Sequence, residues 1–376
     1  MTHRAGPHMP LSSRAAIGDG RGGFVIAATR VRAPQAGEVR VRLRAAGLCH
    51  TDLASLHWPG PLVLGHEGAG EVESVGVGVA GLVPGQRVLL NWAIPCGRCP
   101  PCARGVGALC ERTQGVDPSL GRSEVEPPAG DWQGVPLQRS FRLGTLAEVT
   151  LVRAEALTVL PAALPMHCAC VLGCGVMTGV GSVVNAARVQ PGETVAVLGC
   201  GGVGLSVIQG ARLAGARLIV AIDRHPQALE RARRFGATHV LAADAPDALV
   251  TAVHGLTEGR GVDHAFEATG VPALAFVPLR LVRHGGTALQ VSGATGDAQV
   301  ALTDFWWDKR YLVPLYGNCL PERDFPRLFR WIERGELDIE GLVSRRYRLD
   351  ELQEAFDDLR AGRLAKGVVE FDPATD

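Results

Sequence analysis

A cluster of four cysteines in one short segment limits what this chain can fold into more than any other feature of its sequence. The residues are Cys96, Cys99, Cys102 and Cys110, in a C-x2-C-x2-C-x7-C pattern. Buried cysteines are usually scattered along a chain, whereas thiolates at these spacings can converge on one tetrahedral zinc ion. The cluster therefore predicts a closed, structural zinc site, and a set of buried thiols or a disulfide pair is the less favoured alternative.

A second, incomplete set of metal-ligand residue types lies outside this cluster. Cys49 is followed by His-Thr-Asp, His66 precedes Glu67, and Cys174 stands between two glycines. Each of these residues alone is more often an ordinary side chain than a ligand. Two cysteines and a histidine nevertheless form a known catalytic zinc site when a fourth position is left for water or substrate. We take the remaining cysteines to be ordinary residues: Cys168, Cys170, Cys200 and Cys319.

Composition narrows the class of protein. A chain of 376 residues has room for two domains, and 47% hydrophobic with 20% charged residues indicates a packed core. Lysine plus arginine equals aspartate plus glutamate, 38 each, so no basic excess points to nucleic acid or a membrane surface. No apolar stretch approaches the roughly 20 residues of a membrane helix, and no signal peptide is evident. Closely spaced cysteines indicate metal binding in a reducing compartment, so we expect the cytoplasm.

The first half of the chain has the pattern of β-structure. From about residue 13 to 175 it is rich in glycine, proline and valine. Residues 38–44 alternate apolar and charged side chains, as a half-buried strand does, and 71–75 and 87–90 also have strand character. This half is predicted to form a β-rich barrel.

The pattern changes near residue 177. A buried strand at 194–198 is followed by glycines, an apolar helix and a second strand at 218–222. Such alternation predicts a parallel, doubly wound α/β sheet. Later segments extend the pattern: strands at 239–241, 264–266 and 287–291, helices at 325–333 and 350–360, and a closing strand at 368–371.

A glycine-rich turn follows the first strand of this second half. The glycines of the G-x-G-x-x-G motif are Gly199, Gly201 and Gly204, with Gly202 and Val203 between them. They allow a pyrophosphate to approach the backbone at a helix N-terminus. Asp223 ends the next strand, where a carboxylate accepts the ribose hydroxyls and repels a 2′-phosphate. The motif predicts NAD rather than NADP, although Arg224 would partly offset that repulsion; a plain structural turn is the alternative.

Taken together and in order, these motifs resemble the zinc-dependent medium-chain alcohol dehydrogenases. The matching segments are residues 47–52, 65–72, the cysteine cluster, 173–179 and 198–204, within a resemblance that spans about residues 20 to 371. The branch most similar contains the primary-alcohol and glutathione-dependent formaldehyde dehydrogenases. The resemblance implies an α/β protein with a GroES-like β-rich catalytic domain at 1–176, a Rossmann NAD-binding domain at 177–321, and a tail at 322–376 that returns to the catalytic domain.

The resemblance also assigns roles around the metal. Cys49, His66 and Cys174 would bind catalytic zinc, and the cysteine cluster a second zinc ion. Thr51 would hydrogen-bond the alcohol oxygen and begin proton removal. Asp52 and Glu67 would orient the ligands and tune the metal.

Cofactor and substrate contacts follow from the same resemblance. His50 and Lys366 match cationic positions that contact the pyrophosphate, while Thr178 and Gly293 match positions beside the nicotinamide. The expected pocket residues are Trp92 as an aromatic wall, Leu109 and Ala294.

One position departs from the family pattern. Several members have a histidine three residues after the proton-relay hydroxyl, but this chain has Ala54 there. The proton would then leave through water, His50 or His57, and the sequence does not choose among them. His57 is equally well explained as a solvated loop residue.

Three functions remain open on the sequence alone. The first is reversible hydride transfer between NAD and a primary or aromatic alcohol, with no nucleic-acid or membrane partner. The second is a thiol-dependent formaldehyde dehydrogenase, for which Arg112 could hold a carrier carboxylate, although residues 54–61 offer no acidic group for the carrier's amine. The third is a non-catalytic nucleotide-binding protein, which would have no need of the open ligand set.

The last expectation concerns assembly. In similar enzymes the final strands of the nucleotide domain pair across a two-fold axis, which covers an exposed sheet edge. Residues 297–317 are rich in apolar side chains, including Trp306 and Trp307. We expect a homodimer, with a tetramer as the alternative; an internal core segment is the competing explanation for the tryptophans.

Overall fold

The computed structural model describes residues 9–111, 126–243 and 245–371, which form two compact units. The first contains the described residues up to Cys174, together with Leu320–Phe329 and those from Ile339 onward. The second contains Gly175–Cys319 and Arg330–Asp338. The predicted tail at 322–376 is therefore divided, because Arg330–Asp338 packs with the second unit.

The first unit is built from β-strands, as predicted. A closed barrel joins five of them, and a seven-stranded sheet joins the rest. The barrel order is β1 (Leu11–Gly18), β2 (Phe24–Val31), β7 (Gly130–Trp132), β8 (Val135–Arg139) and β4 (Leu62–Val63). The sheet order is β10 (Leu157–Val159), β6 (Arg87–Leu90), β5 (Gly68–Val75), β3 (Glu38–Gly47), β18 (Lys366–Glu370) and β17 (Val343–Arg348), with β9 (Val149–Arg153) also paired to β3.

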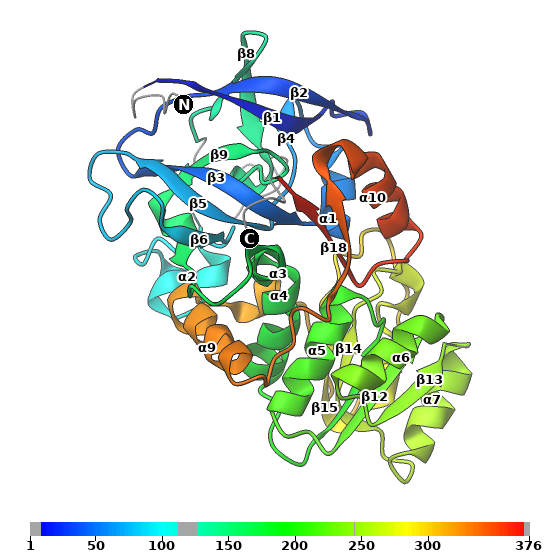
Figure 1. Ribbon diagram of the computed structural model, residues 1–376. Helices are drawn as coiled ribbons and strands as arrows, with labels where there is room; N and C mark the ends of the chain where they lie inside the picture. The colour runs from blue at the N-terminus through cyan, green and yellow to red at the C-terminus, as the bar shows by residue number, and fades with distance from the viewer. Residues whose placement is uncertain (1–8, 112–125, 244, 372–376) are drawn as a thin grey trace. The chain divides into compact units, whose positions relative to one another are not determined.

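Strand β3 is the centre of this sheet. Its apolar residues Val39, Val41 and Leu43 are buried, as the alternating pattern predicts. Arg40 is also fully buried, contrary to that pattern, and its guanidinium pairs with Glu73 at 2.5 Å. Because β5, β9 and β18 all pair with β3, segments distant in sequence lie side by side (Figure 1).

The end of the chain completes the first unit. Strand β18 pairs antiparallel with β3, placing Val368 opposite Gly47. Helix α10 (Leu352–Arg360) buries Leu352 and Phe356 in a cluster with Leu48 and Leu64. Helix α9 (Pro321–Glu333) begins before the predicted residue 325, since its first turn accommodates Pro321. The C-terminal segment thus packs directly behind the residues that lead to Cys49.

The second unit is the predicted parallel sheet. All its strand pairs are parallel, in the order β13 (His239–Ala242), β12 (Leu218–Asp223), β11 (Thr194–Leu198), β14 (Val262–Glu267), β15 (Val282–Gln290) and β16 (Arg310–Leu312). The strand order reverses between β11 and β14, which makes the crevice at their carboxyl ends the expected ligand site. Helices α7 (Pro246–Gly255) and α8 (Val277–Leu281) pack on one face through Leu249, Val253 and Leu281.

The turn from β11 into helix α5 (Gly202–Leu213) requires glycine for steric reasons. Gly199 has φ +91°, and a Cβ there would lie 2.8 Å from the Ala268 carbonyl carbon. A Cβ on Gly204 would lie 1.8 Å from the Gly199 oxygen. A Cβ on Gly201 would meet nothing within 4 Å, so the backbone is open at that position. Two glycines therefore close the turn, while the third leaves room for a ligand.

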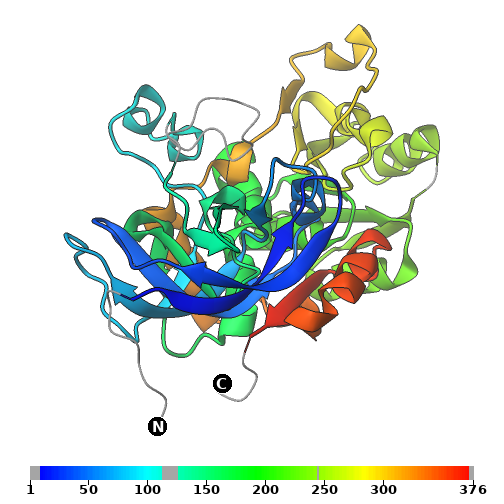
Figure 2. The same cartoon turned by 90° about the horizontal axis from the view of Figure 1, so that it is seen from above.

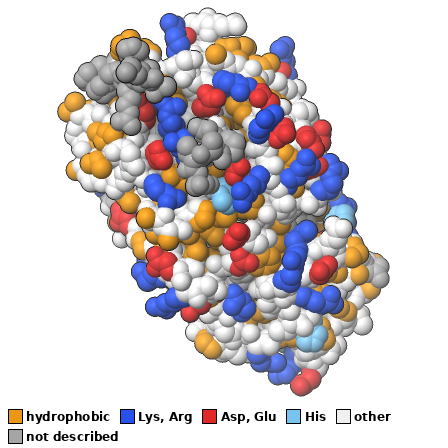
Figure 3. Space-filling view, in the orientation of Figure 1, with side chains coloured by type: hydrophobic (Ala, Val, Ile, Leu, Met, Phe, Trp, Pro, Cys, Tyr) orange, Lys and Arg blue, Asp and Glu red, His pale blue; other side chains and the backbone are white. Residues whose placement is uncertain are grey.

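The surface carries mixed charge. On the face drawn in Figure 3, basic and acidic side chains are interspersed, in keeping with the balanced composition. Among the described residues, no single helix has both the length and the apolar composition of a membrane span, although the bent pair Met166–Gly173 and Gly175–Ala187 meets both criteria jointly.

Candidate active site and metal centres

Three distant segments of the first unit bring the open ligand set together. Cys49 is the N-cap of helix α1 (His50–Ser55), His66 lies between β4 and β5, and Cys174 follows a 3-10 turn at Cys170–Gly173. Ligand atoms of these residues and of Glu67 all lie within 4.8 Å of one another. The sequence predicted the first three as ligands and Glu67 only as a supporting group, whereas the structure also offers its carboxylate as a donor.

The donor set fits zinc. The Nδ1 atom of His66 lies 2.8 Å from Asp52 Oδ1, while its Nε2 is buried without a hydrogen-bond partner among the described residues. A buried polar nitrogen in that state is unfavourable unless a ligand occupies it. Two sulfurs, an imidazole nitrogen and a further oxygen suit zinc in both chemistry and number. Cys49, His66 and Cys174 would hold the ion.

The pKa values of Cys49, His66 and Cys174 are all shifted by their mutual contacts and by burial. The hydrogen bond with Cys174 holds the pKa of the Cys49 thiol well below its usual range, and the same bond raises that of Cys174. Burial disfavours a charged His66, but the charges of Asp52 and Cys49 outweigh it and raise the imidazole pKa. Cys49 is therefore the more acidic of the two thiols. Binding of a divalent cation requires deprotonated thiols and a neutral imidazole, so it would release protons.

Asp52 connects the ligand set to helix α1. It is completely buried; one oxygen binds His66, and the other accepts the Cys49 backbone N–H at 2.9 Å. The carboxylate thus fixes the imidazole and caps the helix that begins at a ligand. The hydroxyl oxygen of Thr51 lies 3.7 Å from the Cys49 sulfur, within the same first turn.

Lys366 lies behind this set rather than on the surface. Its ammonium is 2.6 Å from Glu67 Oε1 and 2.8 Å from the Leu48 carbonyl oxygen, and both charged side chains are buried. Burial raises the pKa of Glu67 to about 7, with the Lys366 charge opposing the shift. Two of the three ammonium donors are therefore engaged within the first unit. The predicted pyrophosphate contact would have to use the third.

Both histidine candidates for proton exit are exposed. His50 is exposed at the first position of α1, and Ala54 lies one turn later in the same helix. His57 packs against a turn, since a Cβ on Gly22 would lie 2.8 Å from its imidazole.

An aromatic cluster that sequence reasoning missed adjoins the ligand set. The Phe141 ring stacks on the His66 imidazole at a centroid distance of 4.3 Å and an interplanar angle of 26°. Trp58 and Trp92 pack against the same ring at 5.4 and 5.5 Å. Trp92 was predicted to be a pocket wall, but no motif marks Phe141 or Trp58. Leu109 is partly exposed, at 38%.

The backbone at Phe141 is unusual for an aromatic residue. Its φ is +52° and that of Arg142 is +61°, both in the left-handed region. Such a conformation is unfavourable for a bulky side chain and persists only where the surroundings impose it. The strain places the ring against the metal ligand, which is where an enzyme can use it.

The four cysteines of the cluster lie together and could hold a metal ion, as their spacing predicts. The four sulfurs lie within 4.8 Å of one another, with 3.9 Å between those of Cys99 and Cys110. Backbone N–H groups of Cys96 and Cys99 donate to neighbouring sulfurs at 3.3 and 3.4 Å. The N–H groups of Arg98 and Cys99 lower the Cys96 pKa to about 6. None of the four cysteines forms a disulfide, which fits a tetrahedral zinc site better than the disulfide alternative.

The nucleotide motif lies in the second unit at the carboxyl edge of its sheet. Gly201 caps helix α5, and the carboxylate of Asp223 accepts the backbone N–H groups of Cys200 and His225, both at 2.8 Å. Asp223 is therefore fixed beside the glycine loop. The Arg224 guanidinium donates to the His225 ring at 3.0 Å. Thr178, Gly293 and Ala294 belong to this unit as well, Thr178 in helix α4 (Gly175–Gly181).

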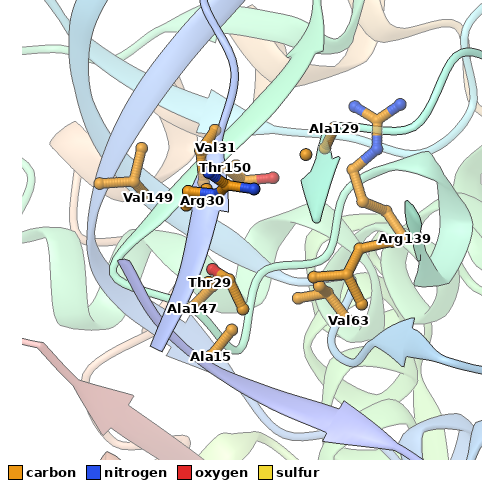
Figure 4. A pocket seen from close by; sticks show the side chains of 12 residues that line it. Ala15, Thr29, Arg30, Val31, Val63, Ala129, Arg139, Ala147, Val149 and Thr150 are labelled. Carbon is orange, nitrogen blue, oxygen red and sulfur yellow. The ribbon is translucent and has the colours of Figure 1, made fainter. Parts of the chain in front are cut away.

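A separate small cavity lies within the first unit's barrel. Its lining is mostly apolar and includes Val31, Val63, Leu137 and the buried Arg139 (Figure 4). It shares no residue with either ligand set, so it is not part of the metal chemistry.

Comparison with known proteins now decides the family. Residues 35–163 match the family described as alcohol dehydrogenase GroES-like domain, and residues 202–334 match zinc-binding dehydrogenase. The chain belongs to the zinc-dependent alcohol dehydrogenases. It is therefore an oxidoreductase, and the non-catalytic alternative is wrong.

Individual relatives cover almost the whole chain. An S-(hydroxymethyl)glutathione dehydrogenase of Escherichia coli O1:K1 is 34% identical over 374 residues, covering 96% of this chain and all of the relative. A zinc-binding-domain alcohol dehydrogenase from Burkholderia ambifaria is similar in structure, with 33% identity and a TM-score of 0.87. Benzyl alcohol dehydrogenase from Acinetobacter calcoaceticus has 31% identity and a TM-score of 0.86. In both comparisons the match covers 96% of this chain and the whole of the solved chain.

The contacts of Asp52 generate a prediction about metal retention. Asp52→Asn keeps the shape of the side chain but removes the charge that orients His66, so zinc affinity should fall roughly 10- to 100-fold. Competition with a chromogenic chelator measures this. Asp131→Asn, which changes a half-buried carboxylate of strand β7 paired with Arg30, is the matched control and should leave zinc affinity unchanged. Equal affinities in the two variants would show that Asp52 has no part in holding the metal.

Proposed function

We propose that this enzyme oxidises primary alcohols, preferentially aromatic ones, to aldehydes with NAD as hydride acceptor, and that it also catalyses the reverse reaction. The observation that carries the proposal is the open Cys49–His66–Cys174 set with an aromatic cluster stacked on one of its ligands. The ligand set supplies the chemistry of alcohol activation. The half-buried Trp58 and the buried Trp92 and Phe141 form an apolar aromatic wall beside the ligand set, against which a substrate ring would pack.

The protein's own residues prepare the reaction. When bound, zinc would supply Lewis-acid activation of the alcohol oxygen, and NAD would supply the hydride acceptor. Thr51, close to the Cys49 sulfur, takes the hydroxyl proton and passes its own proton toward solvent. Asp52 keeps the His66 ring in place, and the aromatic side chains exclude water. The proton would then leave through His50, which is exposed at the start of α1, through the exposed His57 or through water.

The second candidate is oxidation of a carrier-thiol adduct of formaldehyde. The relative in Escherichia coli named S-(hydroxymethyl)glutathione dehydrogenase keeps this candidate open. The loop at 54–61 contains no acidic residue to bind the carrier's amine, and Arg112 lies outside the described residues. The aromatic cluster favours a bare aromatic alcohol, the substrate named for the Acinetobacter relative.

A substrate comparison tests the two candidates. With NAD, kcat/KM for benzyl alcohol should exceed that for ethanol by at least about tenfold, since burial of a ring adds apolar contact area. Formaldehyde with glutathione should give a lower kcat/KM than benzyl alcohol. A higher value for the glutathione adduct would replace the first candidate by the second, and activity with neither class would refute both.

Thr51 should carry the proton. Thr51→Ala should reduce alcohol oxidation by about 10²–10⁴-fold, the usual contribution of a positioned acid–base group, while zinc content stays unchanged. Thr51→Ser keeps the hydroxyl and should retain most activity. The rate of alcohol oxidation, measured across a range of pH, should be lower in Thr51→Ala than in Thr51→Ser. Full activity in Thr51→Ala would mean that the proton leaves directly to water.

Asp223 supports NAD as the cofactor. Its carboxylate is fixed at the end of β12, where it would accept ribose hydroxyls and repel a 2′-phosphate. Asp223→Gly should shift the ratio of kcat/KM values toward NADP, because Arg224 then meets the phosphate unopposed. An unmodified enzyme that already prefers NADP would show that Arg224 outweighs Asp223.

Two zinc ions per chain follow from the two donor sets. Elemental analysis of chelator-free protein should give a ratio near two, and Cys99→Ser should reduce it to near one and lower stability, since structural zinc contributes directly to folding. A ratio near one in the parent enzyme would remove one of the sites.

A homodimer is the proposed assembly, with a tetramer as the alternative. Strand β16 is at one edge of the sheet, and the segment before it extends outward (Figure 2). Trp306 and Trp307 are 58% and 65% exposed, which argues against a core role for either. A second copy would cover these rings and the open edge. Light scattering at micromolar concentration tests this, and the mass of one chain would refute it.

The cytoplasm is the proposed location. None of the ten cysteines, all of which the structure describes, forms a disulfide, and seven belong to the two candidate ligand sets, as expected in a reducing compartment. Cell fractionation tests the assignment.

A further inference from the structure

Glu267 has an environment that the catalytic chemistry does not explain. It is the last residue of β14 and is completely buried. One carboxylate oxygen accepts the backbone N–H of Thr269, the Thr269 hydroxyl and, at 3.0 Å, the Gly270 N–H. The other oxygen accepts the Ser292 hydroxyl. In the described part of the chain, no lysine or arginine forms an ion pair with it, so these four donors alone offset the burial of the carboxylate.

The donors belong to two different loops. Thr269 and Gly270 lie in the loop after β14, and Ser292 lies just beyond β15. The loop after β14 also abuts the glycine motif, because a Cβ on Gly199 would lie 2.8 Å from the Ala268 carbonyl carbon. The Ala268 N–H donates to the Leu198 oxygen at 2.7 Å. Glu267 thus ties together the loops that follow β14 and β15, and the first of these loops abuts the turn after β11.

These loops surround the position where the topology puts a ligand. Strand order reverses between β11 and β14, and ligands of open parallel sheets bind outside the carboxyl ends at that point. Thr269 is exposed although its N–H and hydroxyl point back to Glu267. The inner side of the loop is therefore fixed, and its outer side is available for binding.

We propose that Glu267 is a positioning residue for the dinucleotide, holding the loops after β14 and β15 in the conformation that binds it. The inference rests on the proposed use of NAD. Fixing a loop before binding removes the entropy that the ligand would otherwise have to offset. Loss of these hydrogen bonds therefore weakens cofactor binding beyond any effect on folding.

The same strand supplies a matched control. Asp263 lies in β14 near its amino end. Its carboxylate accepts hydrogen bonds from three donors: the Thr194 N–H at 2.8 Å, the Thr194 hydroxyl at 2.7 Å and Arg283 Nε at 2.6 Å. Removing either carboxylate should lower the melting temperature. Only removal of the Glu267 carboxylate, at the carboxyl edge of the sheet, should alter cofactor affinity.

The experiment measures NADH affinity by fluorescence titration of the zinc-loaded enzyme and KM for NAD under saturating alcohol. Glu267→Ala should raise the NADH dissociation constant and KM for NAD by roughly tenfold, the equivalent of a lost charge-assisted hydrogen bond, with a smaller change in kcat. Glu267→Gln retains an amide oxygen and should have an intermediate effect, and Ser292→Ala a smaller one. Asp263→Ala should stay within about twofold of the parent.

The outcomes separate this inference from the proposed function. If the parent enzyme binds NADH and Glu267→Ala and Glu267→Gln bind it equally well, Glu267 is structural only. The same conclusion follows if Asp263→Ala weakens binding as much as Glu267→Ala. If Glu267→Ala does not fold, Glu267→Gln and Ser292→Ala decide the question. A parent enzyme that binds no NADH refutes the use of NAD itself.

Discussion

The first unit depends on the burial of several metal-seeking donors in one place. Two thiols, an imidazole and a carboxylate lie within 4.8 Å of one another, with His66 and Glu67 buried and the two cysteines half-buried. Donors so concentrated repel one another unless positive charge is supplied. Asp52 holds His66 from one side, and Lys366 meets Glu67 from the other. The pairing of β18 with β3 brings Lys366, which carries the only buried ammonium in the described chain, to these donors.

The second unit depends on a different constraint: the carboxyl edge of its parallel sheet must stay open while its loops keep a fixed shape. Gly199 and Gly204 let β11 turn tightly into α5, and Gly201 leaves space at the helix N-terminus. Asp223 is held by two backbone N–H groups, and Glu267 by four donors from neighbouring loops. Both carboxylates lie at the ends of parallel strands. Hydrogen bonding to the half-buried Asp223 and the buried Glu267 thus gives these loops a preformed shape.

In the proposed function, substrate choice would depend on side chains that perform no chemistry. Phe141 stacks on a ligand, and Trp58 and Trp92 pack on Phe141, so the apolar surface begins at the metal site itself. The left-handed backbone at Phe141 and Arg142 is the conformational cost of that placement. Among enzymes that share the same ligand set, such neighbours distinguish one alcohol from another.

The sequence alone determined the features that depend on residue type and short spacing. The cysteine cluster, the glycine turn and the alternating strand pattern predicted the closed zinc site, the parallel sheet and the β-rich unit, because each is a local property of the chain. Tertiary structure alone decided the partners of Lys366, the stacking of Phe141 on His66 and the donors around Glu267. These contacts join residues far apart in the chain, and no short spacing encodes them. They form only when strand pairing has already brought the segments together.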